Sequence, residues 1–584
     1  MAPVQFDRVR HGGAMENAEI AKVLDEIADL LEIGGENFFR VRAYRNAART
    51  VRDFPGNVAA LERKQLGQMP GIGAGLADSI ATLVESGDLP IRSQLLATFP
   101  PGLLELRHVP GLGPKRIKQI AQELHIRDRD ELEAALRSGA LRTLRGFGAK
   151  MEQRILDALT RKPPEPQRRI SWADAAPLAM RILKHLKICP AIERAKAAGS
   201  FRRRRDTVGD LDIVAVSGDA TAAMAHFASF PEIAQSLGAG ETRTSVILTV
   251  GLQVDLRVIP ARSWGAALLY FTGSQAHCVR LRRLAQLKGM LLNEYGLYRG
   301  DELVAGATEE AVYGALGLEW IASELREERG EVEAARDHRL PLLLTRADLR
   351  GDLHSHSTYT DGRASIEEMA IAARDHGLEY FALTDHSQHL AMVKGLDPVR
   401  LREQWREIDQ VRGRVSGIKI LRGIEVDIME DGTLDLPDEV LDELDWVVAS
   451  VHYKLNQPAD EMTRRMVRAM QNPYVDVIGH PTGRILNRRE PSGFDLDEVL
   501  RVAREEGCAL EVNSQPDRLD LTDIACLTAK RAGVKLVVSS DSHSPRGFGL
   551  LEHGVNQARR GWVEASDVLN SRPLESLRVR RGFS

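Results

Sequence analysis

The sequence predicts a multidomain α/β protein with an all-α N-terminal region, an α+β middle and a C-terminal (β/α) barrel. At 584 residues the chain is long enough for several separate cores. A proline-rich break at 162–167 and a second break near 338–352 divide it. Helical periodicity dominates before the first break, helices and β-branched strands mix between the breaks, and short apolar strands alternate with helices afterwards.

The N-terminal third contains three glycine turns, "MPGIGAGLADSI" (69–80), "VPGLGPKRIKQI" (109–120) and "LRGFGAKMEQRIL" (143–155). In each, an apolar residue precedes a G-x-G turn and an amphipathic helix, so backbone amides point outward where a phosphate can bind. The turns resemble helix-hairpin-helix elements, which hold the DNA backbone without reading bases, although purely structural hairpins remain the alternative. The candidate DNA-binding residues are Gly71, Gly73, Gly111, Gly113, Lys115, Gly146, Gly148 and Lys150.

The middle segment contains "GSFRRRRDTVGDLDI" (199–213), in which an arginine run precedes two aspartates one residue apart. Side chains alternate along a strand, so Asp210 and Asp212 point to the same face, and Asp255 of "LQVDLRVI" is expected on a neighbouring strand. Three such carboxylates can hold two Mg²⁺ ions. The arginines and the adjoining turn would then neutralise a triphosphate, whereas the simpler alternative is a solvated charged surface.

The C-terminal segment places metal-ligand side chains at the ends of successive predicted strands, where catalytic groups of (β/α) barrels gather. Nitrogen and oxygen donors without thiolates suit two or three Mn²⁺ or Zn²⁺ ions rather than a structural zinc site. Arg484 and Lys454 could hold a substrate phosphate or be solvated. The candidate ligands are His354, His356, Asp361, His386, Glu425, His452, His480, Asp541 and His543.

Net charge is unevenly distributed along the chain. The total is −4, but residues 341–584 carry 32 Lys+Arg against 40 Asp+Glu, so the first 340 residues are net positive. Because nucleic acid prefers a basic surface, DNA contacts are expected before residue 341. The four scattered cysteines predict no disulfide framework, and no apolar run has membrane-spanning length, so we expect a cytoplasmic protein without membrane contact.

The motifs "GSFRRRRDTVGDLDI", "VDLRVI", "YFTGS" and "NEYGL" resemble those of the family X DNA polymerases, over roughly residues 17–320. The resemblance implies that Asp210, Asp212 and Asp255 are catalytic metal ligands. It implies nucleotide contacts from Arg169, Ser200, Arg203, Gly209, Tyr270, Phe271, Gly273 and Arg282. Among these, Tyr270 and Phe271 match a sugar-checking pair, and Arg282 matches a residue that reaches the template or nascent base pair.

Two positions depart from the family pattern. Cys278 stands where the family often has asparagine, and a thiol is a poor substitute for an amide that bonds a base edge. Some relatives also have a Schiff-base lysine in the first hairpin helix, where this chain has Ser79, and Gly75 at another basic position. Without an amine there, 5′-deoxyribose phosphate lyase activity by that route is not expected.

The C-terminal ligands are similar to those of the PHP (polymerase and histidinol phosphatase) domain, across about residues 345–575, with all nine ligand positions filled. The domain order resembles the bacterial family X DNA polymerases. It implies gap filling in base excision repair with Mg²⁺, dNTPs and gapped DNA. It also implies a PHP site with two or three Mn²⁺ or Zn²⁺ ions that trims 3′ ends as a 3′→5′ exonuclease, with abasic-site cleavage in some members. Lack of a coiled-coil repeat favours a monomer.

These inferences give expected domain boundaries. A PHP small-molecule phosphatase and a non-catalytic DNA-end-binding scaffold remain the competing functions. The expected parts are a disordered tail (1–14), a helical domain with a helix-hairpin-helix (15–95), a fingers-like second helical domain (96–162), a nucleotidyltransferase palm (163–260), a thumb (261–330), a linker (331–347) and the PHP domain (348–584).

Overall fold

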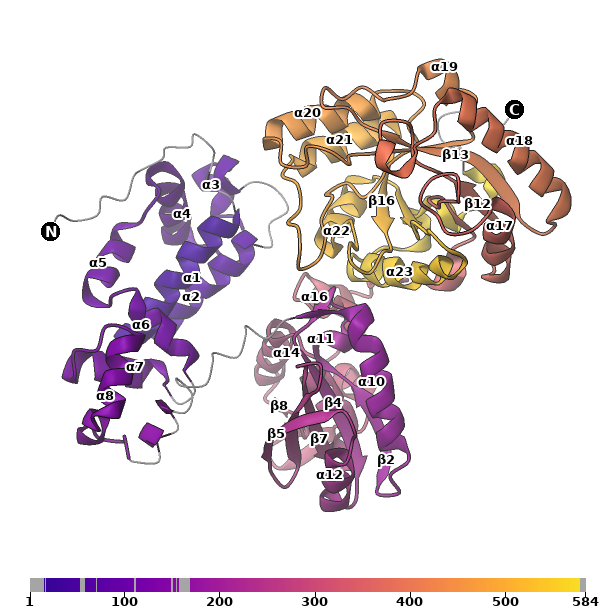
Figure 1. The fold of residues 1–584 in the computed structure, drawn as a ribbon. Coiled ribbons are helices and arrows are strands. Elements are labelled where there is room, and N and C mark those ends of the chain that lie inside the picture. The colour runs from indigo at the N-terminus through magenta and orange to yellow at the C-terminus, as the bar shows by residue number, and fades with distance from the viewer. Residues whose placement is uncertain are drawn as a thin grey trace. The chain divides into compact units, whose positions relative to one another are not determined.

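The computed structural model describes residues 15, 17–52, 58–69, 71–109, 112–148, 151–153, 155–156 and 169–577. The chain forms two compact units, Met1–Pro166 and Gln167–Ser584 (Figure 1). The expected tail at 1–14, the proline-rich break at 162–167, and the candidate residues Gly111 and Lys150 lie outside the described residues.

The first unit is helical, as predicted, and is built around two apolar cores. Both cores include residues of α1, since Leu24 packs in the first and Leu30 in the second. Gly73 and Gly113 are the N-cap residues of α4 and α7, so two of the predicted G-x-G turns do open helices. The described helices are α1 (Asn17–Gly34), α2 (Phe38–Arg52), α3 (Arg63–Leu66), α4 (Ala74–Ser86), α5 (Pro90–Thr98), α6 (Gly102–Glu105), α7 (Pro114–Glu123) and α8 (Arg129–Arg137).

The second unit begins with the palm, a mixed sheet in the order β2-β4-β7-β6-β5 (Figure 1). Alternation along β4 sends Leu211 and Ile213 toward helices α10 and α12, and Val214 toward α13 on the opposite face. The sheet is therefore covered on both sides. Its elements are α10 (Trp172–Lys187), β2 (Ile192–Ala197), α11 (Gly199–Arg202), β4 (Asp210–Ser217), α12 (Ala220–Ala228), β5 (Ile233–Ala239), β6 (Arg243–Leu248), β7 (Gln253–Ile259) and α13 (Trp264–Thr272), with β1 (Ile170–Ser171) paired to β3 (Thr207–Val208).

The thumb follows the palm, and its apolar core includes residues of a helix from the expected linker. The expected linker at 331–347 contains α16, whose Val332 and Ala335 are buried in the thumb core. These side chains pack with apolar residues of α14 and α15, so a packed helix lies where the sequence predicts a linker. The thumb elements are α14 (Gln275–Leu287), β8 (Leu291–Asn293), β9 (Gly296–Arg299), β10 (Glu302–Ala305), α15 (Glu309–Ala315) and α16 (Glu331–Arg336).

The rest of the unit is the predicted (β/α) barrel: seven parallel strands in chain order, with Ser355 and Ser542 bridging the first and last strand ends. None of the described helices is both long and apolar enough to cross a membrane. The strands are β11 (Gly351–Asp352), β12 (Tyr380–Leu383), β13 (Lys419–Asp427), β14 (Trp446–Ser450), β15 (Val477–Ile478), β16 (Ala509–Asn513) and β17 (Leu536–Ser539). The helices are α17 (Ile366–Asp375), α18 (Pro398–Arg414), α19 (Asp438–Leu441), α20 (Ala459–Met470), α21 (Leu496–Glu506), α22 (Asp523–Ala532) and α23 (Leu551–Arg560).

Candidate active sites

The palm brings the three predicted aspartates to neighbouring positions of two strands. Asp210 and Asp212 are alternate residues of β4, and the parallel register pairs Asp212 directly with Asp255 of β7. Burial, together with the charges of Asp210 and Asp255, raises the pKa of Asp212 to about 7. Burial and the charge of Asp255 raise the pKa of Asp210 as well. Carboxylates that disfavour each other's ionisation in this way fit a divalent cation.

A glycine lets the chain pass close to this cluster. Gly199, the first residue of α11, has φ of +59°, and a Cβ atom there would lie 2.2 Å from Oδ2 of Asp212. The neighbouring amide of Ala198 donates to the carbonyl of Asp212 over 2.7 Å. The turn between β2 and α11 is therefore held directly against the second aspartate, at a position that only glycine fits.

A cleft of about 500 Å³ opens beside the aspartates. The hydroxyl of Ser200 is buried and makes no hydrogen bond within the described structure, so it is free to donate to a ligand. Gly209 does not line the cleft, but it lies next to Arg169. A Cβ atom on Gly209 would lie 3.0 Å from Nη1 of Arg169. Nine predicted residues line the cleft: Arg169, Ser200, Arg203, Asp210, Asp212, Tyr270, Phe271, Gly273 and Arg282.

The four consecutive arginines divide between the cleft and the interior. Arg203 and Arg205 line the cleft. Arg202 instead makes two hydrogen bonds of 2.8 and 2.7 Å to the carboxylate of Glu309, which ties the palm to α15. Arg204 lies over the ring of Trp172, 4.4 Å from its centroid. Arg202 and Arg204 thus stabilise the fold. Arg203 and Arg205 lie in the cleft, where the sequence predicts a triphosphate site.

Tyr270, Phe271 and Cys278 form the apolar wall of the cleft. The rings of Tyr270 and Phe271 meet edge to face at 5.1 Å, and Arg282 lies over the Tyr270 ring. The thiol of Cys278 donates to the carbonyl of Tyr270 over 3.5 Å. Burial raises the pKa of this thiol, so at neutral pH it remains protonated. Its weak S–H donor is already directed at this carbonyl, so the thiol is a poor substitute for the side-chain amide of an asparagine.

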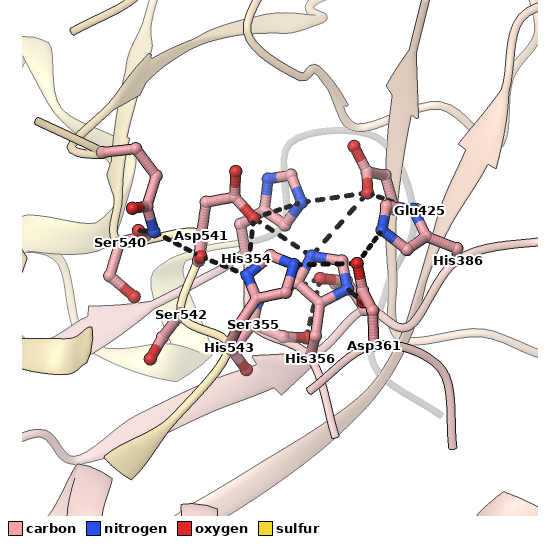
Figure 2. Close-up of polar contacts among 12 residues, drawn as sticks. His354, Ser355, His356, Asp361, His386, Glu425, Ser540, Asp541, Ser542 and His543 are labelled. Carbon is pink, nitrogen blue, oxygen red and sulfur yellow. Dashed lines mark hydrogen bonds and ion pairs between the residues drawn. The ribbon is translucent and has the colours of Figure 1, made fainter. Parts of the chain in front are cut away.

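In the barrel all nine predicted ligand residues converge at the carboxyl ends of the strands, and Figure 2 shows seven of them labelled. The described residues contain three groups whose ligand atoms lie within 4.8 Å of one another, and all three groups are here. The groups are His356, Asp361, His386 and His543; His354, His356 and Asp541; and His386, Glu425 and His452.

Glu425 is the hub of this cluster. One carboxylate oxygen lies 2.7 Å from Nδ1 of His386, and the other lies 3.0 Å from Nε2 of His480 and 3.3 Å from Nε2 of His452. Although burial works in the opposite direction, the surrounding histidines hold the pKa of Glu425 well below its ordinary value. Nε2 of His354 and Nδ1 of His356 are buried and make no hydrogen bond with any residue that the structure describes. Nitrogen atoms left open in this way, around an ionised carboxylate, fit bound divalent cations.

A second layer of carboxylates, which was not predicted from the sequence, fixes these histidines. Glu511 lies 2.7 Å from Nδ1 of His354 and accepts the backbone amide of His480 over 2.6 Å. Asp427 lies 2.8 Å from Nδ1 of His452. Partners on Nδ1 orient the rings and leave Nε2 for a metal. The sequence feature that could have revealed this layer is a carboxylate within an apolar strand, Glu511 in "CALEVNS" and Asp427 in "RGIEVDI".

The two basic side chains considered for phosphate binding lie in different surroundings. Arg484 is only 8% exposed, and its Nη2 lies 3.0 Å from the carboxylate of Asp206 in the palm. Lys454 is largely exposed, with its amine 3.9 Å from Glu430. Arg484 is therefore occupied by a contact between palm and barrel.

The described hairpin glycines are open to solvent. A Cβ atom at Gly73, Gly113 or Gly148 would meet no atom of the described residues within 4 Å, and Gly71 and Gly146 have φ of +80° and +89°. Lys115 is exposed beside Gly113. In the first hairpin helix the Ser79 hydroxyl donates to the carbonyl of Gly75 over 2.9 Å, so this position offers no amine. These turns leave room for a nucleic-acid backbone to approach.

Family comparisons match separate parts of the chain. The matching models describe a helix-hairpin-helix domain (residues 15–89), a SAM-like helix-hairpin-helix tandem (103–161), a DNA polymerase beta thumb (267–327) and a PHP domain (352–515).

Curated relatives cover either the whole chain or the barrel. The DNA polymerase/3′-5′ exonuclease PolX of Bacillus subtilis is 36% identical over 96% of this chain and 99% of its own length. Probable phosphatases of Thermoanaerobacter sp. and Vibrio campbellii are 33% and 29% identical over 38% of the chain, covering 89% and 88% of their own lengths. Near full-length similarity to the first, together with the hairpin, thumb and PHP matches, shows that the chain belongs to the bacterial family X DNA polymerases with a C-terminal PHP domain.

Proposed function

We propose that this chain fills short gaps in DNA as a DNA-directed polymerase and trims 3′ ends at a second site as a metal-dependent 3′→5′ exonuclease. The observation that carries the proposal is the presence of two separate metal-type centres in one compact unit. One is the aspartate cluster beside a nucleotide-sized cleft, and the other is the nine-residue cluster of the barrel. The Bacillus subtilis relative has both activities in its name.

In the palm, Asp210, Asp212 and Asp255 would hold the cations and orient them toward the cleft. Ser200, Arg169 and Arg203 would bind the triphosphate, since a hydroxyl and two guanidinium groups line the cleft beside the aspartates. Tyr270 and Phe271 would pack against the sugar. Divalent ions supply activation of the attacking hydroxyl and stabilisation of the leaving oxygen at each centre.

In the barrel, Glu425 and the surrounding histidines would hold two or three cations, while Glu511 and Asp427 keep the rings oriented. Oxygen-only ligands in the palm favour Mg²⁺, and the imidazole-rich barrel favours Mn²⁺ or Zn²⁺. The open hairpin turns of the first unit would hold the DNA backbone, with gapped duplexes as the substrate of base excision repair.

Point variants separate the two activities on one substrate. Purified protein with a gapped duplex, dNTPs and Mg²⁺ should extend the primer, and with Mn²⁺ it should shorten a 3′ end. Asp210→Ala should abolish extension and leave trimming intact, whereas His354→Ala should do the reverse. If either substitution removed both activities from a folded protein, the assignment of two separate sites would be wrong.

The barrel relatives favour a second candidate, a phosphatase of small molecules. The aspartates and lined cleft of the palm count against it, because a phosphatase needs neither. Hydrolysis of p-nitrophenyl phosphate without any cleavage of DNA would favour this alternative. A non-catalytic DNA-end-binding scaffold would lack bound metal, so metal analysis of the purified protein distinguishes it.

A further inference from the structure

The barrel domain contacts the loop of the palm that lines the nucleotide cleft. We propose that Arg560 and Arg484 of the barrel are positioning residues for nucleotide binding, so that the polymerase pocket is complete only when the barrel is docked against it. The inference rests on the proposed polymerase function and assigns to the barrel a role in extension that is separate from its own metal cluster.

The first contact is made by Arg560, the last residue of α23. Its guanidinium is fully buried, and Nη1 donates to the backbone carbonyl of Arg203 over 2.7 Å. Nη2 is held by the carboxylate of Asp523 at the start of α22. A buried arginine bonded to a backbone carbonyl fixes the path of the chain at that residue, here the cleft arginine Arg203.

Glu327 joins the two guanidinium groups. Its Oε1 accepts from Nε of Arg203 over 3.0 Å and from Nη1 of Arg560 over 3.1 Å. Nη1 of Arg203 donates to the carbonyl of Thr272, so Nη2 is left without a hydrogen bond in the described structure. Two of its nitrogens are thus anchored while the third remains available to a phosphate in the cleft. The barrel, through Arg560, holds the carboxylate that sets this orientation.

The second contact lies at the other end of the same loop. Arg484, nearly buried, pairs with Asp206 over 3.0 Å. Three residues later, the side-chain Nδ2 of Asn487 donates to the backbone carbonyl of Arg169 over 3.1 Å. The barrel therefore holds residues 203–206 and Arg169 in place. Arg203 and Arg169 both line the cleft.

Arg559 provides a matched control for Arg560. It is the preceding residue of the same helix and also crosses to the thumb, donating to Glu324 over 2.8 Å. Its hydrogen bonds in the described structure go to Glu324 and to the carbonyl of Leu344, and none of them reaches residues 203–206, unlike those of its neighbour. Loss of either arginine should weaken the docked barrel, but only loss of Arg560 should release the cleft arginine.

The experiment measures steady-state extension of a gapped duplex and Mn²⁺-dependent trimming of a single-stranded oligonucleotide. Arg560→Met should raise KM for dNTP about tenfold, the effect of losing one charge-assisted hydrogen bond. Its kcat should change less than its KM, and trimming should stay at the wild-type rate. Arg559→Met should lower the melting temperature while leaving KM for dNTP unchanged. Arg560→Lys should recover part of the loss.

If Arg560→Met does not fold, the pair Arg484 and Asp206 carries the test. Arg484→Met and Asp206→Asn should each raise KM for dNTP, and the double variant should be no worse than either single one. Unchanged KM in folded Arg560 or Arg484 variants would overturn the inference, as would an equal rise in Arg559→Met. Absence of extension by the wild-type protein would instead overturn the proposed polymerase function.

Discussion

Single residues decide how closely the palm packs around its aspartates, and Gly199 is the tightest point. A methyl group there would meet Oδ2 of Asp212, and the positive φ is unfavourable for any other residue. We expect Gly199→Ala to displace the Asp212 carboxylate and lower the extension rate by about a hundredfold or more, because misplaced catalytic groups cost that much. Extension and trimming assays on the same preparation check it.

Gly218→Ala is the matched control for this substitution. Gly218 follows the same strand, β4, and a Cβ there would meet nothing within 4 Å. It should retain wild-type extension. Trimming should persist in both variants, because the barrel is untouched. Normal extension by Gly199→Ala would show that the turn can yield without moving Asp212.

Cys278 lines the cleft at a position where the resemblance to family X polymerases leads us to expect asparagine. The thiol points to the carbonyl of Tyr270 and offers the nucleotide no strong donor. Cys278→Asn should lower KM for the correct dNTP about fivefold, corresponding to one added hydrogen bond of about 1 kcal/mol. Single-nucleotide insertion kinetics measure this effect. Cys278→Val, which adds bulk without a donor, should bring no gain, and an equal gain in both variants would contradict the explanation.

At the level of elements, β16 supports two ligands of the barrel cluster through one side chain. Glu511 bonds the ring of His354 and the backbone of His480, which belong to the loops after β11 and β15. Glu511→Gln should reduce metal affinity by about 10- to 100-fold, the usual effect of losing a carboxylate behind a ligand histidine. Chelator competition with Mn²⁺ measures it. Retained affinity with lost trimming would contradict this role.

The elements themselves were largely predictable from the sequence. Alternation of apolar strands with helices predicted the parallel barrel, and strand ends predicted where His354 and Asp541 would meet. The packed α16 was missed because short amphipathic segments after a charged stretch carry little periodic signal. Within the arginine run, only the family resemblance distinguished Arg203 from Arg202 and Arg204. The structural roles of Arg202 and Arg204 could not be predicted, because their partners lie far away along the chain.

The domains of the second unit are held together by contacts that no sequence motif predicts. Arg560, Arg329 and Asp523 form a network that links the barrel to the thumb, joining residues nearly 200 positions apart. Such contacts arise only when both domains are folded, so local patterns cannot reveal them. They connect the polymerase and nuclease parts of the second unit physically.

This network makes the unit sensitive to acid. Although burial works in the opposite direction, Arg560, Arg203 and Arg205 lower the pKa of Glu327 from 4.5 to about 2. A carboxyl whose pKa is lower in the folded state stabilises the protein fully above its unfolded pKa, and this contribution disappears as pH falls from about 4.5 through about 2. For Glu327, whose side chain is only 10% exposed, the contribution is about 3 kcal/mol.

Glu327→Gln tests this at the scale of the whole molecule. At pH 7 the variant should melt several degrees below the wild type, because a neutral glutamine cannot form ion pairs with the guanidinium groups of Arg203 and Arg560. The gap between their melting temperatures should narrow steadily as pH is lowered from 5 to 3, because the wild-type carboxyl then loses its advantage. Calorimetry at constant ionic strength measures both curves. A gap that stayed constant with pH would show that Glu327 is not held ionised by the arginines, and that the junction of palm and barrel is stabilised by packing instead.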